Sequence, residues 1–242
     1  MHRFYCEQLD ARGRAALTPE DAHHAARVLR LRPGDPVELI CQGARYRARM
    51  LENSLLEAGE SLPTTEPELR ITLFQGLPKG DKMDLIVQKA VEIGVARVVP
   101  VMMRRCVVKL SPGDGEKKQA RWQKIAREAG KQSGRCLLPE VTRPIPFPEV
   151  AAAAQACGRL LVPWEEARAM GPRGFAESHP GLRSLGILIG PEGGIDPEEI
   201  AALPECQPLT LGPRILRTET AGLAAAAALL ALYGEMETNE LS

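Results

Sequence analysis

A glycine-rich loop in the last third of the chain combines the residue types of a ligand-binding turn. Residues 188–194 are Leu-Ile-Gly-Pro-Glu-Gly-Gly, so the glycines directly follow an apolar run that is predicted as a buried strand. Asp196, Pro197 and Glu199 then form the pattern of a helix start, with a cap, a proline at the first helical position and a capping-box carboxylate. Glycines let a backbone approach a ligand closely, so we expect a ligand here. A tight strand-to-helix turn is the alternative.

This loop lacks the signatures of two common nucleotide sites. No G-K-[ST] ending follows its glycines, and no G-x-G-x-x-G pattern follows a predicted strand elsewhere in the chain. A nucleoside cofactor bound here would therefore be held neither as in a P-loop nor as in a Rossmann fold.

A second segment with residues suited to chemistry covers residues 209–220. Its sequence, Leu-Thr-Leu-Gly-Pro-Arg-Ile-Leu-Arg-Thr-Glu-Thr, predicts a short strand, a Gly-Pro turn and the start of an alanine-rich helix. Thr218 is the expected cap of that helix. Arg214 and Arg217 are expected to project near the glycine-rich loop, and two solvated arginines on a connector are the alternative.

Charge is segregated along the chain, although the formal net charge is zero. Residues 104–143 contain eleven Lys or Arg against four Asp or Glu, and residues 144–206 contain four against nine. A helix predicted over residues 116–133 carries much of this basic charge, as a stripe that Arg135 continues: Lys117, Arg121, Lys124 and Lys131. Such a stripe can follow the phosphates of a nucleic acid or can simply be a solvated face. The first part of the chain adds Arg3, Arg12, Arg14, Arg27, Arg30 and Arg32.

Predicted elements divide the chain at residue 67. Residues 1–67 read as a small β-rich module, with strands over 37–40 and 45–50 and a helix over 19–29 that Thr18 caps. Residues 68–242 alternate apolar strands with helices, which predicts a largely parallel sheet. The predicted strands are 69–74, 98–102, 159–162, 185–189 and 207–211, and the predicted helices are 82–92, 116–133, 197–203 and 219–233.

The sequence also argues against several classes of protein. The cysteines are far apart, without a C-x-x-C pair or a histidine at ligand spacing, so we expect reduced thiols and no metal. No apolar run approaches the roughly 20 residues that a membrane-spanning helix needs, and no segment has the features of a signal peptide. We therefore expect a cytoplasmic protein without a membrane anchor.

In their order along the chain, these segments resemble the RsmE family of ribosomal RNA uridine-N3 methyltransferases, in the SPOUT superfamily. No single motif is specific, but the ordered set covers nearly the whole chain. The matching segments are His-His-Ala-Ala-Arg-Val-Leu-Arg at 23–30, Gly-Asp at 34–35, Gln-Gly-Leu-Pro-Lys-Gly-Asp-Lys-Met at 75–83, Gln-Lys-Ala-Val-Glu-Ile-Gly-Val at 88–95, the stretch 121–135 with Pro139, the 190–194 loop and residues 211–221.

The resemblance implies a PUA-like β-barrel in residues 1–67 and a SPOUT α/β methyltransferase domain in residues 68–242, with a trefoil knot in its C-terminal part. It implies a homodimer that binds S-adenosylmethionine in the knot, between three loops. The implied cofactor-binding residues are Val162, Pro163, Gly190, Pro191, Glu192, Gly193, Leu211, Gly212, Ile215, Leu216 and Thr220. Whether Trp164 contacts the cofactor is left open.

The implied reaction is methylation of one uridine near the 3′ end of 16S rRNA, in the assembled small ribosomal subunit. N3 of a paired uridine is protonated and buried, so the base must be turned outward and deprotonated. For stabilisation of the uridine anion we nominate Arg217, and for proton removal Glu192 or Glu219. The candidate RNA contacts are Arg3, Arg12, Arg27, Arg30, Lys79, Lys82, Arg121, Lys124, Arg135 and Arg214.

Two other functions remain possible from the sequence. A ribose 2′-O-methyltransferase of tRNA or rRNA would share the superfamily's fold and cofactor loops, although the N-terminal module and residues 23–30 favour the base methylase. A non-catalytic RNA-binding ribosome-assembly factor would bind RNA but not S-adenosylmethionine, and the intact 190–194 loop argues against it.

Overall fold

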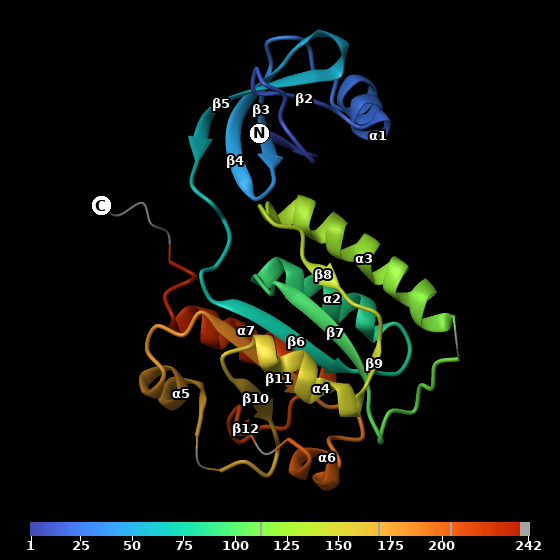
Figure 1. The fold of residues 1–242 in the computed structure, drawn as a ribbon, viewed down its shortest axis with the longest axis vertical. Helices are drawn as coiled ribbons and strands as arrows, with labels where there is room; N and C mark the ends of the chain where they lie inside the picture. The colour runs from blue at the N-terminus through green and yellow to red at the C-terminus, as the bar shows by residue number, and fades with distance from the viewer. Residues whose placement is uncertain (112, 169, 204, 238–242) are drawn as a thin grey trace. The chain divides into compact units, whose positions relative to one another are not determined.

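The computed structural model describes residues 1–111, 113–168, 170–203 and 205–237, which form two compact units (Figure 1). One unit contains Met1–Glu66 and Gly130–Leu138, and the other contains Pro67–Ala129 and the chain from Pro139 onward. The segment Gly130–Leu138 is therefore grouped with the N-terminal strands. Our division into domains at residue 67 stays a prediction.

The N-terminal unit is built on a five-stranded sheet. Its strands, in the order β1-β3-β4-β5-β2, are β1 (His2–Cys6), β3 (Pro36–Cys41), β4 (Ala44–Met50), β5 (Leu55–Leu62) and β2 (Arg14–Ala16). Apolar side chains such as Phe4, Leu39 and Leu56 form its core. Only β1 and β3 pair in parallel, and the other neighbours are antiparallel.

A helix is confirmed over most of the predicted range 19–29, but its second half is π-helical. The α-helix α1 covers Pro19–His23, and a π-helical turn, His24–Val28, follows it. The predicted cap is confirmed, because Oγ1 of Thr18 accepts a hydrogen bond from the backbone N–H of Asp21 at 3.1 Å. A short 3-10 turn, Glu52–Ser54, connects β4 to β5.

A buried ion pair holds the segment Gly130–Leu138 in the N-terminal unit. Arg135 is 4% exposed, and its guanidinium lies 2.7 Å from Oε2 of Glu66. Oε1 of Glu66 accepts the backbone N–H of Cys136 at 2.7 Å, and the Tyr5 hydroxyl donates to the Arg135 carbonyl oxygen at 2.7 Å. Burial is the main reason why the pKa of Tyr5 is raised above its usual value. Arg135 thus serves the packing of this unit, and we withdraw it from the candidate RNA contacts.

The second unit contains a seven-stranded sheet in which every pairing is parallel, as predicted. The path β12-β10-β11-β6-β7-β8 places β6 and β11 in the middle, and β9 also pairs with β7. The strands are β6 (Arg70–Gly76), β7 (Arg97–Met102), β8 (Glu140–Val141), β9 (Ile145–Pro146), β10 (Leu160–Pro163), β11 (Ser184–Ile189) and β12 (Cys206–Leu209). Strands β8 and β9 were not predicted.

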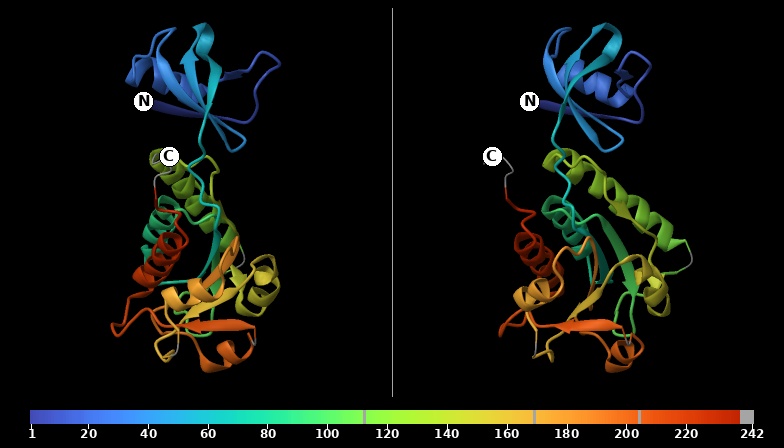
Figure 2. Two further views of the ribbon diagram at one scale, coloured as in Figure 1. Left: turned by 90° about the vertical axis from the view of Figure 1, so that its left-hand side faces the viewer. Right: turned by 60° about the vertical axis from the view of Figure 1, so that its left-hand side comes forward.

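Helices cover both faces of this sheet. Figure 2 shows α2 and α7 on one face, where they also pack on each other, and α4 on the other face. The helices are α2 (Lys82–Ile93), α3 (Asp114–Ser133), α4 (Val150–Ala153), α5 (Pro172–Ser178), α6 (Pro197–Ala201) and α7 (Thr218–Leu232), with 3-10 turns at Phe147–Glu149 and Ala154–Ala156. The predicted four helices are confirmed, while α4 and α5 were missed.

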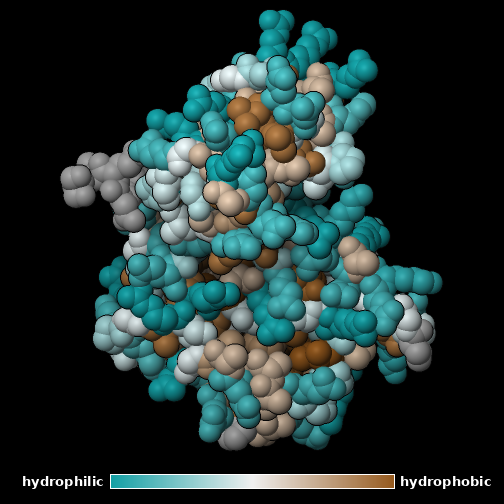
Figure 3. Space-filling view, turned by 45° about the horizontal axis from the view of Figure 1, so that its top comes forward, coloured by the Kyte–Doolittle hydropathy of each residue, from teal (hydrophilic) through white to brown (hydrophobic). Residues whose placement is uncertain are grey.

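The central strands are apolar because helices bury them on both faces. Ile71, Leu73 and Phe74 of β6 and Leu185 and Ile187 of β11 are fully buried. Hydrophilic residues predominate on the face of the molecule in Figure 3. No helix in the described part of the chain is long and apolar enough to cross a membrane.

Candidate functional site

A cavity of about 770 Å³ opens beyond the carboxyl ends of the neighbouring strands β10 and β12, of which β12 lies at the edge of the sheet. Its walls are residues 163–168, at and after the end of β10, residues 210–216, which lead to α7, and Ala221 of α7. Of the predicted cofactor residues, the structure places five on these walls: Pro163, Leu211, Gly212, Ile215 and Leu216. Trp164 also lines the cavity, while Val162 is buried in β10 and Thr220 is exposed on α7.

The turn over residues 190–194 connects the end of β11 to the short lead into α6. A Cβ atom on Gly190 would lie 2.9 Å from the backbone carbon of Gly194 and 3.0 Å from the backbone nitrogen of Ile195. The backbone N–H of Gly194 donates to the carbonyl oxygen of Pro191 at 2.9 Å, which closes the turn. A Cβ on Gly194 would lie 3.2 Å from Oε1 of Glu165, a residue of the cavity wall, so the turn lies beside the cavity.

The predicted capping box after the turn is confirmed. The Asp196 side chain accepts the backbone N–H of Glu198 at 3.0 Å, and the Glu199 carboxylate accepts the backbone N–H of Asp196 at 3.3 Å. Because these contacts join residues two or three positions apart, the local sequence is sufficient to specify them.

Two consecutive arginines after β7 bind this turn, although the sequence alone did not indicate them as site residues. The guanidinium of Arg105 donates to the carbonyl oxygen of Gly193 at 3.2 Å. The backbone N–H of Arg104 donates to Oε1 of Glu199 at 2.8 Å, and its guanidinium pairs with Asp196 and Glu198. Their position shortly after β7, a strand that neighbours β6, was the available signal, because parallel strands end at one edge of the sheet.

A second cluster of charges contacts the turn through Glu192. Nζ of Lys82 is 3.0 Å from Oε1 of Glu192 and 3.1 Å from Oε2 of Glu219. The backbone N–H of Lys79 donates to Oε1 of Glu192 at 3.1 Å. The structure therefore joins both predicted proton acceptors to one lysine, which we had assigned to RNA.

The acid–base properties of this cluster favour ionised carboxylates. Burial acts to raise the pKa of Glu192, but the hydrogen bonds from Lys82 and from backbone N–H groups outweigh it, so the pKa is lowered. A backbone hydrogen bond and then Lys82 lower the pKa of Glu219, and the two carboxylates raise the pKa of Lys82. An efficient general base has a pKa near the working pH. The cluster is therefore suited to fixing loop geometry and poorly suited to accepting a proton.

The predicted cap of the last helix is wrong. Arg217 is the N-cap of α7 and its side chain makes no capping bond, whereas Thr218 is the first helical residue. The Thr218 hydroxyl instead donates to the carbonyl oxygen of Gly190 at 2.7 Å. Arg217, Arg214 and Ile215 are exposed, and Arg217 is close enough to Glu219 to contribute to its lowered pKa.

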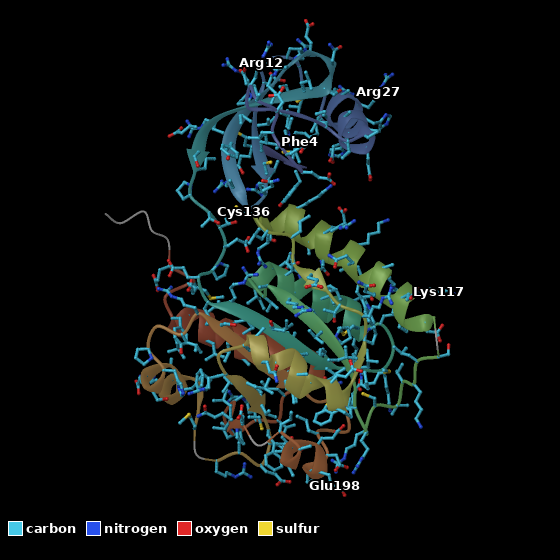
Figure 4. The ribbon with its side chains drawn as sticks, viewed as in Figure 1. Phe4, Arg12, Arg27, Lys117, Cys136 and Glu198 are labelled. Atoms are coloured by element: carbon cyan, nitrogen blue, oxygen red, sulfur yellow. The ribbon has the colours of Figure 1, made fainter. Side chains whose placement is uncertain are left out.

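The candidate RNA contacts fall into two groups. Arg12, Arg27 and Arg30 are exposed in the N-terminal unit, and Figure 4 shows Arg12 and Arg27 at its outer surface. In the second unit the exposed candidates are Lys79, Arg121, Lys124 and Arg214.

Some of the candidates form ion pairs with carboxylates. Arg3 lies 2.8 Å from Glu38, and Arg121 pairs with Asp84 and, at 3.5 Å, with Asp81. The basic stripe of α3 is therefore compensated at Arg121, by Asp84 of α2 and by Asp81 at the N-cap of α2. Lys117, at the start of α3, remains exposed (Figure 4).

Comparison with known proteins places this site in a family. Residues 65–230 match a family model described as RNA methyltransferase domain, and residues 17–52 match one described as RNA methyltransferase PUA domain. A curated relative from Bacillus subtilis (strain 168), named ribosomal RNA small subunit methyltransferase E, is 34% identical and covers 95% of this chain and 96% of its own length. A relative of the same name from Mycobacterium bovis is 33% identical, over 93% of this chain and 90% of its own length.

Solved structures agree with this relationship. A ribosomal RNA small subunit methyltransferase E from Neisseria gonorrhoeae, bound to S-adenosylmethionine, has a TM-score of 0.79 and 34% identity, and the match covers 96% of this chain and 98% of that one. A methyltransferase from Legionella pneumophila, in complex with the same cofactor, has a TM-score of 0.78 and 30% identity, over 95% and 96% of the two chains. The expected fold class, a PUA-like module and a SPOUT-type α/β domain, is confirmed. The chain belongs to the RNA methyltransferase family whose curated members include the proteins named ribosomal RNA small subunit methyltransferase E.

Proposed function

We propose that this protein transfers a methyl group from S-adenosylmethionine to N3 of one uridine in 16S rRNA. The observation that carries the proposal is the cavity of about 770 Å³ beside the glycine turn, at the carboxyl ends of parallel strands. Ligands of open α/β sheets bind at this edge. The family relationship and the cofactor-bound relatives support the choice of cofactor and of RNA.

The residues of the cavity fit S-adenosylmethionine. Small-molecule sites usually have volumes of about 300–1,000 Å³ and combine apolar walls with a few polar groups. Trp164, Leu211 and Leu216 supply apolar surface, and Glu165 and Glu166 supply carboxylates for the ammonium group or the ribose hydroxyls. When bound, S-adenosylmethionine supplies an electrophilic methyl group on a sulfonium.

The protein's own residues would orient the uridine and stabilise its anion. Arg217 is exposed to solvent, and it directly follows Leu216 of the cavity wall. Its guanidinium is therefore accessible to RNA and close to the expected position of the methyl donor. A positive charge placed where an oxyanion develops lowers the barrier most effectively. We assign Glu192 and Glu219 to holding Lys82 and the turn, because their lowered pKa values make them weak bases.

Exposed lysines of α3 would bind the RNA backbone. The double variant Lys117→Glu/Lys124→Glu is expected to weaken RNA binding and to reduce the slope of log K against log salt concentration by about two, since each lost phosphate contact removes about one. Titration of labelled small-subunit RNA at several salt concentrations measures this. The matched control, Arg159→Glu/Arg183→Glu, makes the same charge change at the amino ends of β10 and β11 and should retain the slope. An unchanged slope in the α3 variant would exclude these lysines from the RNA surface.

The function is tested by methyl transfer from labelled S-adenosylmethionine to small ribosomal subunits that lack the native modification. We expect label in 3-methyluridine at a single site, identified by the mass of the nucleoside. Label on a ribose would instead show a 2′-O-methyltransferase. No label, together with no cofactor binding by calorimetry, would leave a non-catalytic RNA-binding protein.

Three further features belong to the same proposal. The family resemblance supports a homodimer that acts in the cytoplasm and a trefoil knot in the C-terminal part of the chain. No group of three or more His, Cys, Asp or Glu that could hold a metal occurs in the described residues.

A further inference from the structure

A buried amide connects three segments of the second unit. Gln75, at the end of β6, is 0% exposed, and its Nε2 donates to Oγ1 of Thr218 at 2.9 Å. The Thr218 hydroxyl donates in turn to the carbonyl oxygen of Gly190 at 2.7 Å. One chain of hydrogen bonds thus runs from β6 through the first residue of α7 to the first residue of the 190–194 turn.

The direction of each hydrogen bond follows from its neighbours. Nε2 of Gln75 also donates to the carbonyl oxygen of Gly76 at 3.1 Å, and the opposite orientation of the amide would place two oxygens against each other. Since the Thr218 hydroxyl has one hydrogen and gives it to Gly190, it must accept from Gln75. The donor at position 75 is therefore required by this arrangement.

The Gln75 amide leaves one buried oxygen without a hydrogen bond from the described residues, which destabilises the fold. Oε1 of Gln75 is buried and has no hydrogen-bond partner among the described residues. A buried acceptor without a partner destabilises a fold, and an apolar side chain of similar size would avoid the loss. The NH₂ group of Gln75 must then contribute something that an apolar residue cannot, and its contact with Thr218 shows what that is.

The Thr218 hydroxyl binds the chain just beyond the last residue that is paired in the sheet. Ile189, the last residue of β11, pairs with Gln75 in the sheet, and Gly190 is the first residue beyond that pairing. Thr218 directly follows the segment that leads from the cavity wall into α7. The Thr218 hydroxyl therefore ties the start of the turn to the wall segment.

We propose that Gln75 and Thr218 are positioning residues that fix the Gly190 carbonyl, and with it the 190–194 turn, in the conformation that binds the cofactor. The inference rests on the proposed function in so far as the turn serves S-adenosylmethionine. Neither side chain touches the reacting atoms, and each acts through the backbone of the turn.

Paired substitutions test this in the full-length protein. Thr218→Val removes the hydroxyl and keeps the branched shape, Thr218→Ser keeps the hydroxyl, and Gln75→Leu removes the donor. We expect Thr218→Val and Gln75→Leu each to raise the Kd for S-adenosylmethionine in calorimetry about tenfold, which corresponds to the loss of one hydrogen bond. Thr218→Ser should stay within about threefold of the native Kd. Because both residues act through one chain, the double variant should be weaker than the native protein by less than the product of the two effects.

A second readout does not depend on the cofactor. Amide hydrogen exchange at residues 192–194 should become faster in Thr218→Val and Gln75→Leu, while amides in the middle of β6 and β11 keep their protection. Thr72→Val removes another hydroxyl from β6, away from the turn, and should change neither exchange at the turn nor the Kd.

The outcomes separate this inference from the proposed function. If the native protein binds S-adenosylmethionine and both variants bind it equally well, the positioning role is wrong. Failure of the native protein to bind the cofactor would reject the proposed function, and exchange at the turn would then decide the inference. Unchanged exchange in both variants would overturn it.

Discussion

Arg217→Ala is expected to lower the single-turnover rate of methyl transfer by about 10²–10³-fold and to leave the affinity for S-adenosylmethionine within about twofold. The side chain is exposed at the N-cap of α7 and makes no capping bond, so its loss should not disturb the helix. Loss of the Arg217 guanidinium should slow only the step in which negative charge develops on the uridine. A rate effect without an affinity effect is the pattern of an interaction made in the transition state.

Arg214→Ala is the matched control for this prediction. Arg214 is also exposed, three residues earlier on the same segment, and it lines the cavity. If it binds RNA, its removal should raise the RNA concentration needed for half-maximal rate and leave the rate at saturating RNA nearly unchanged. A near-native single-turnover rate for Arg217→Ala would show that another group stabilises the uridine.

Gly190→Ala should weaken binding of S-adenosylmethionine at least about 100-fold, because the turn cannot close around a methyl group. The new Cβ would lie 2.7 Å from Cγ1 of Ile195, 2.9 Å from the backbone carbon of Gly194 and 3.0 Å from the nitrogen of Ile195. Two of these atoms belong to the backbone, so a side-chain rotation cannot relieve the contact. The turn must open, and a displacement of about 1 Å is enough to cost a factor of about 10² in a preorganised site.

Calorimetry with the cofactor, supported by circular dichroism of the folded protein, measures this effect. Gly174→Ala is the control: a Cβ there meets only the Cγ of Met170, at 3.8 Å, and an alanine inside α5 should slightly stabilise the helix. Gly190→Ala protein that folds and binds S-adenosylmethionine with native affinity would show that the turn does not hold the cofactor.

Features that depend on neighbours in the sequence could be predicted from the sequence. The all-parallel sheet follows from apolar runs separated by helical patterns, and the Asp196 capping box joins residues only three positions apart. The order of the motifs also identified the family before any side chain was placed. The same local reasoning did not foresee that residues 24–28 of the predicted helix are π-helical, and it missed the short elements β8, β9, α4 and α5.

The choice of partner for each polar side chain depended on the tertiary structure. Lys82 lies between Glu192 and Glu219, Arg121 meets Asp84, and Thr218 bonds to Gly190 instead of capping its own helix. Arg135 and Arg105 likewise bind residues that are distant in the sequence, Glu66 and Gly193 respectively. These pairs are separated by tens of residues, and no periodicity or spacing in the sequence encodes them. The sequence by itself therefore determined where the basic residues are along the chain. Only the packing of strands and helices decided whether each of these side chains faces solvent or pairs with another residue.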